Sequence, residues 1–182
     1  VTSTQSDVRT TINGGQATDI FNIHNSANQV NEIAGLLEIF GATNGDGSDS
    51  DTLNVIDSGD AVDNFGLLTV NSISGLGMGT NDQSVINSNR GIRYQGLEKL
   101  NITLGSGADH FTVSAVSLGT TTTLDAAGGS DVLTIGDNLS EINAPLFIHG
   151  GADDKTTLKI NSTGATTLTL KSDLGGQQGI LE

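Results

Sequence analysis

The sequence predicts an all-β protein and, within that class, a parallel β-solenoid with loop insertions. A phrase made of a Gly-rich turn, an Asp and alternating apolar residues recurs along the 182 residues, and such repetition indicates stacked coils rather than one globular core. Aromatic residues make up only 3% of the chain, which suits an interior of stacked Val, Ile and Leu better than a large sandwich core. A β-sandwich is the alternative fold.

Five copies of this phrase stand out in the sequence. They run over Asn13–Ile23, Gly47–Val55, Gly105–Val113, Gly128–Ile135 and Gly150–Ile160. In each copy, Gly, Asn and Asp favour a turn, and the alternation that follows predicts a short strand.

Short strands are expected wherever apolar and polar residues alternate. Their expected centres are Asn22, Glu38, Asn54, Thr69, Arg93, Ile102, Thr112, Thr123, Thr134, Phe147, Lys159 and Leu168. From Ile102 onward the steps are 10, 11, 11, 13, 12 and 9 residues, so two steps span about 22 residues. We expect strands that far apart to lie parallel, because no Asn-Gly or Asp-Gly hairpin turn follows Gly47.

The first half of the chain is less regular. Residues 24–44 predict either a short helix or a two-faced strand, and residues 57–96 predict an irregular insertion. Insertions in repeat arrays tend to gather on one face and often carry binding. We expect residues 1–182 to form a single solenoid segment of a longer chain.

Composition narrows the possible partners. The net charge is −14 and the chain has seven Lys and Arg, so nucleic acid is not an expected partner. No apolar stretch approaches the roughly 20 residues that cross a bilayer, so no membrane insertion is expected. Cys is absent, which excludes a disulfide scaffold and thiolate metal sites. An acidic, Cys-free chain fits large bacterial surface proteins, and it fits many cytosolic proteins too. Of these we expect an extracellular or cell-surface location in a bacterium.

The turns resemble those of the calcium-binding repeats-in-toxin family, whose nonapeptide is G-G-x-G-x-D-x-U-x with U a large apolar residue. The first copy carries Gly14, Gly15, Asp19 and Phe21 at matching positions, with Ala17 in place of a glycine. The resemblance implies a parallel β-roll from a secreted bacterial protein, with calcium held between the turns of neighbouring coils.

Carried over by position, the resemblance implies that Asp19, Asp51, Asp109 and Asp131 are calcium ligands. In that family the nonapeptides follow one another directly, whereas these Asp residues are separated by 32, 58 and 22 positions. The chain therefore looks more like the degenerate Gly-Asp repeats of giant bacterial surface proteins.

Calcium is the cofactor that the sequence predicts, because Gly-Asp turns present the carboxylate and carbonyl oxygens that calcium takes as ligands. The densest acidic cluster is Asp46, Asp49, Asp51, Asp57, Asp60 and Asp63, with no Lys or Arg between them. The predicted metal ligands are Asp19, Asp46, Asp49, Asp51, Asp109, Asp131, Asp153 and Asp154. The alternative is that these side chains bond to turn backbone and keep the surface solvated.

The sequence contains no catalytic signature. It lacks a G-x-S-x-G elbow and Cys, and its three His lack metal-ligand spacing, so we expect no enzyme. The expected function is that of a structural or adhesive repeat module, with neighbouring repeats and a cell-surface or matrix polymer as partners. The alternative is a polysaccharide-degrading β-helix enzyme, which needs a facing pair of carboxylates.

Overall fold

The computed structural model describes residues 1–42, 49–79, 90–136, 138–151 and 155–161. In this part of the chain, strands and one short 3-10 helix, η1 (Leu139–Glu141), make up the regular structure. An eight-stranded sheet contains, in spatial order, β1 (Thr10–Gly15), β3 (Leu36–Ala42), β7 (Gly91–Gln95), β6 (Ser72–Gly75), β5 (Phe65–Leu68), β9 (His110–Val113), β11 (Val132–Ile135) and β13 (Thr157–Ile160). A five-stranded sheet contains β12 (Leu146–His149), β10 (Thr121–Asp125), β8 (Lys99–Thr103), β4 (Thr52–Ile56) and β2 (Ile20–Ile23). The all-β prediction is confirmed.

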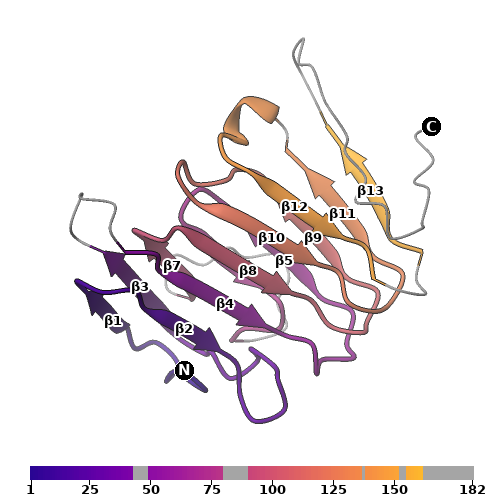
Figure 1. The fold of residues 1–182 in the computed structure, drawn as a ribbon. Coiled ribbons are helices and arrows are strands. Elements are labelled where there is room, and N and C mark those ends of the chain that lie inside the picture. The colour runs from indigo at the N-terminus through magenta and orange to yellow at the C-terminus, as the bar shows by residue number, and fades with distance from the viewer. Residues whose placement is uncertain (43–48, 80–89, 137, 152–154, 162–182) are drawn as a thin grey trace.

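The chain passes back and forth between the two sheets, and we call one pass through both sheets a coil (Figure 1). Corresponding strands of successive coils pair in parallel. Lys99 lies beside Thr121 in one sheet, and His110 lies beside Val132 in the other. Both pairs are 22 residues apart, which is the spacing that the sequence predicts for strands that lie one on the next.

The earlier coils are longer. Ile20 pairs with Thr52, and Thr52 pairs with Lys99, so the connections between these strands hold the additional residues. Within residues 24–42, the described part of this range, the regular element is the strand β3, so a strand and not a helix forms there. The expected strand at Leu168 lies outside the described residues.

Among the described strands, antiparallel pairing occurs within residues 57–96, where an irregular insertion was expected. Strands β5, β6 and β7 form an antiparallel meander in the eight-stranded sheet. The expectation of one strand centred on Thr69 is wrong, because the chain reverses there. The Thr69 amide donates to the Ser72 carbonyl at 2.9 Å, and the two hydroxyl groups lie 2.6 Å apart.

Side chains alternate between the core and the surface along the paired strands, as a pleated sheet requires. Leu53 packs in register with Leu100, and Val55 with Ile102, and all four side chains are buried. On the outer face of the same sheet, an amide ladder links the coils. The Asn54 side chain donates to Asn22 Oδ1 at 2.7 Å, and the Asn101 side chain donates to Asn54 Oδ1 at 2.8 Å.

Glycines allow the turns of successive coils to approach closely. A Cβ at Gly129 would lie 1.8 Å from the Gly107 carbonyl oxygen, and a Cβ at Gly59 would lie 1.8 Å from the Ala27 carbonyl oxygen. Atoms cannot approach to that distance, so any side chain at these positions would separate the turns. Close approach thus explains the glycine at Gly105, Gly107 and Gly129 in the repeated phrase, where a Cβ would lie 2.4 Å or less from a backbone oxygen of another turn.

Replacing Gly129 therefore tests the contact between turns. Gly129 has a φ of +107° and Gly15 has a φ of +101°, but a Cβ at Gly15 would meet nothing within 4 Å. Alanine costs about 1–2 kcal/mol of backbone strain at either position. We expect Gly129→Ala to lower the free energy of unfolding by about 2 kcal/mol more than Gly15→Ala, measured by urea unfolding. Equal losses in the two variants would show that the close contact does not matter.

Candidate functional site at the stacked turns

A polar residue stands immediately before most of the paired strands, at the corners where the chain enters a sheet. In β2, β4, β5, β8, β9 and β11 the first residue is exposed or only partly buried, so the residue before it points into the stack. The exposed fraction is 0% for Asp51 and 1% for both Asp109 and Asp131. The corner residues are Asp19, Asp51 and Glu98 before β2, β4 and β8, and Asn64, Asp109 and Asp131 before β5, β9 and β11.

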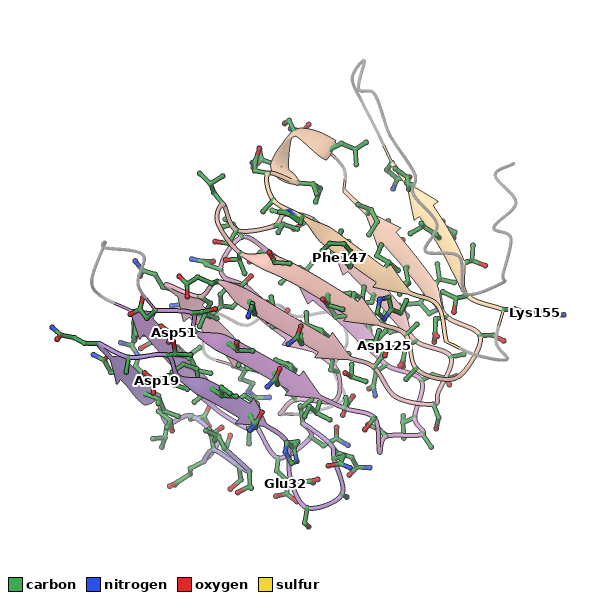
Figure 2. The ribbon with its side chains drawn as sticks, viewed as in Figure 1. Asp19, Glu32, Asp51, Asp125, Phe147 and Lys155 are labelled. Carbon is green, nitrogen blue, oxygen red and sulfur yellow. The ribbon has the colours of Figure 1, made fainter. Side chains whose placement is uncertain are left out.

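At the corner that leads into the five-stranded sheet, carboxylates link three coils. The backbone N–H of Asp19 donates to Asp51 Oδ1 at 2.7 Å. The backbone N–H of Asp51 in turn donates to Glu98 Oε2 at 2.7 Å. Figure 2 shows Asp19 and Asp51 at the same edge of the sheet, on neighbouring coils.

The opposite corner repeats this arrangement. The backbone N–H of Asn64 donates to Asp109 Oδ1 at 2.8 Å, and that of Asp109 donates to Asp131 Oδ1 at 2.8 Å. The second oxygen of Asp109 accepts the Gly105 N–H at 3.2 Å. In both corners the carboxylate of one coil therefore caps the backbone of the preceding coil.

These bonds explain why the phrase contains an Asp. A backbone N–H buried at the start of a strand requires an acceptor, and a carboxylate is a stronger acceptor than a neutral group. Hydrogen bonds to charged groups contribute about 1.5–3 kcal/mol each. The two pairs, Asp19 with Asp51 and Asp109 with Asp131, thus have a structural role that the sequence analysis only considered as the alternative.

The predicted metal ligands are distributed over both corners. The structure brings Asp19 and Asp51 together, and separately Asp109 and Asp131. Asp49 is half-buried, two residues before Asp51. Asp46, Asp153 and Asp154 lie outside the described residues. Among the described residues, no three or more His, Cys, Asp or Glu form a group that could hold a metal. Calcium stays a prediction.

Glu98 and Asn64 were not among the predicted site residues, because neither follows a Gly-Asp turn. Both stand one residue before an alternating strand, and that position is the signal that could have identified them.

A further group of carboxylates is buried in the turn between β4 and β5. Asp57 Oδ1 accepts the Val30 N–H at 3.0 Å, and Asp60 Oδ2 accepts the side-chain amide of Asn64 at 3.1 Å. The pKa of Asp57 is raised from 3.8 to about 7. Burial is the largest cause, the hydrogen bond from Val30 lowers the pKa, and the negative charges of Asp60 and Asp109 contribute to the rise. Burial likewise raises the pKa of Asp109.

A shallow pocket of about 180 Å³ lies on the outer face of the eight-stranded sheet, where β3 and β7 meet. Its lining includes Glu38, Phe40, Asn71 and Arg93. Glu38 is the only carboxylate in this lining, and it lies 3.6 Å from Arg9 and 4.0 Å from Arg93. The pocket therefore does not present the facing pair of carboxylates that glycoside hydrolysis uses.

Comparison with known proteins identifies no relative: no family model, no curated protein and no solved structure matches the chain. Within the described residues, the structure has no helix of the length and apolar character needed to span a membrane.

Two substitutions at Asp51 separate an acceptor role from a metal-ligand role. Asp51→Asn keeps an oxygen that can accept the Asp19 N–H, so we expect a loss of at most about 1 kcal/mol in the free energy of unfolding. Asp51→Leu removes the acceptor, and we expect a loss of about 2–3 kcal/mol. Urea unfolding measures both changes.

Melting each variant in EDTA and in calcium is the matching control. A metal that binds only the folded protein must raise its melting temperature. A calcium-dependent rise that both Asp51→Asn and Asp51→Leu abolish would contradict the acceptor role and support a ligand role for Asp51.

Proposed function

We propose that this chain is a segment of a parallel β-solenoid and serves as a structural or adhesive module of a larger secreted or cell-surface bacterial protein. The observation that supports this most is the in-register parallel pairing of successive coils in both sheets. Each coil buries its apolar side chains against the coils on either side of it, so the stability of such a stack comes mainly from nearest neighbours. A stack of this kind can be extended by adding coils.

Neighbouring repeats are the first proposed partner, and the C-terminal end of the described stack supports this. Leu133 is 0% exposed, whereas its register partner Leu158 in β13 is 41% exposed. Similarly, Leu124 is buried while its partner Ile148 in β12 is only half-buried. A further coil placed on β12 and β13 would bury these side chains as the inner coils bury theirs.

The outer surface suits a module that stays extended in solution. The chain carries a net charge of −14, and the outer face of the five-stranded sheet carries the amide ladder of Asn22, Asn54 and Asn101. Self-repulsion of like charges keeps such a surface solvated and opposes non-specific association. We propose a cell-surface or matrix polymer as the second partner of this surface.

Leu133 and Leu158 provide a test of the repeat context. In the 182-residue chain we expect Leu133→Ala to cost about 3 kcal/mol and Leu158→Ala about 1 kcal/mol, because Leu158 is partly exposed. In a longer chain that includes the following repeats, the cost of Leu158→Ala should approach that of Leu133→Ala. Urea unfolding of both variants in both chains measures this. An unchanged cost for Leu158→Ala would mean that no coil covers β13.

The proposed location and function are tested on the source organism. Antibodies against this segment should label intact cells or the culture medium, and brief protease treatment should remove the label from cells. Labelling that requires lysis would contradict the proposal. Release of reducing sugar from a polysaccharide by the purified segment would instead support the alternative, a polysaccharide-degrading enzyme.

A further inference from the structure

Three carboxylates from successive turns are buried together at one corner of the stack. Asp57 and Asp60 belong to the turn between β4 and β5, and Asp109 ends the turn between β8 and β9. Their exposed fractions are 0%, 2% and 1%. The turn between β2 and β3 contributes the Val30 N–H to Asp57 and the Asn31 side-chain amide to Asp60, each at 3.0 Å. The group therefore ties together three turns that are far apart in the sequence.

The hydrogen bonds of this group leave one carboxylate oxygen without a donor. Asp60 accepts from the Val62 N–H through Oδ1, and from Asn31 and Asn64 through Oδ2. Both oxygens of Asp109 accept backbone N–H groups. Asp57 uses Oδ1 alone, and within the part of the chain that the structure describes its buried Oδ2 has no hydrogen-bond partner.

Among the described residues, the charges that act on Asp57 do not compensate its own charge. The charged groups that act on it are Asp60 from its own turn and Asp109 from the next, and Asp63 acts in turn on Asp109. All of them are carboxylates. Burial of an uncompensated charge among like charges is costly, and a group in this position reduces the cost by binding a proton.

We propose that Asp57 is a proton-dependent lock between three successive turns: the turns stack tightly while Asp57 carries a proton on its unpartnered oxygen, and the stack loosens when that proton is lost. Protonation neutralises one of the buried negative charges. It also converts Oδ2 of Asp57 from an acceptor without a donor into a hydroxyl group. The lock makes the module stiffer in mildly acidic surroundings than in alkaline ones.

The direction of the pH dependence follows from the raised pKa. The folded protein holds the Asp57 proton up to a pKa of about 7, whereas the group's ordinary value is 3.8. Between these values the folded chain binds more protons than the unfolded chain, so the contribution of Asp57 to stability falls as the pH rises. Above about pH 7 the loss is complete and this contribution levels off.

The test compares the melting temperatures of three proteins at pH 5 and pH 8. Asp57→Asn keeps an oxygen for the Val30 N–H and is neutral at both values, so it imitates the protonated state. Asp7→Asn is the matched control, because it removes one negative charge at an exposed position. We expect the melting temperature of the unsubstituted protein and of Asp7→Asn to fall by about 5 °C more between pH 5 and pH 8 than that of Asp57→Asn.

Equal falls in all three proteins would overturn the proposal. A rise in melting temperature with added calcium at pH 8 that Asp57→Asn abolishes would also overturn it, because a cation rather than a proton would then compensate Asp57. A direct measurement covers the case in which Asp57→Asn does not fold. The Asp57 carboxyl carbon of the unsubstituted protein, followed by NMR, should titrate near pH 7, and a midpoint near pH 4 would refute the lock.

Discussion

The stack depends on an acceptor for the buried backbone N–H at the start of each strand. At both corners, the acceptor is a side chain from the next coil, as with Asp51 for Asp19 and Asp131 for Asp109. Each of these bonds joins a backbone N–H of one coil to a carboxylate of the next, so it fixes the spacing and the register of the two coils together. The parallel pairing of the sheets and the packing of the core follow from that registration.

Part of the chain's acidic composition lies inside the stack and not on its surface. A net charge of −14 suggests an acidic surface, yet Asp51, Asp57, Asp60, Asp109 and Asp131 are all buried. Inside the stack, backbone N–H groups take the place of water as partners for these carboxylates. Asp109 has two backbone N–H donors, and each of its carboxylate oxygens accepts a hydrogen bond. At Asp57, Oδ1 alone has a donor among the described residues, so the free-energy cost of burying the charge remains.

Local patterns predicted much of this fold, because the later coils are regular. The strands around Thr123 and Thr134 and the spacing of about 22 residues follow from alternation and turn residues alone. The reversal after Leu68 could not be predicted from such patterns, because the turn at Thr69 to Asn71 contains neither Asn-Gly nor Asp-Gly.

The corner bonds were also beyond local patterns. Asp51 and Glu98 are 47 residues apart, and the long connection between them gives no sign that the two will meet. The burial of Asp57 is likewise set by which turns stack against it. The sequence thus showed which residues were available for a site, while the choice between metal ligand and hydrogen-bond acceptor depended on contacts between coils.

The hairpin of β5 and β6 adds two strands to one sheet and none to the other, since β4 and β8 pair directly in the five-stranded sheet. With neighbouring strands about 4.8 Å apart, the eight-stranded side is locally wider by about 10 Å. We therefore expect the coils that precede the hairpin to be inclined to the coils that follow it. A long fibre built from such coils would bend at this segment, toward the side of the five-stranded sheet.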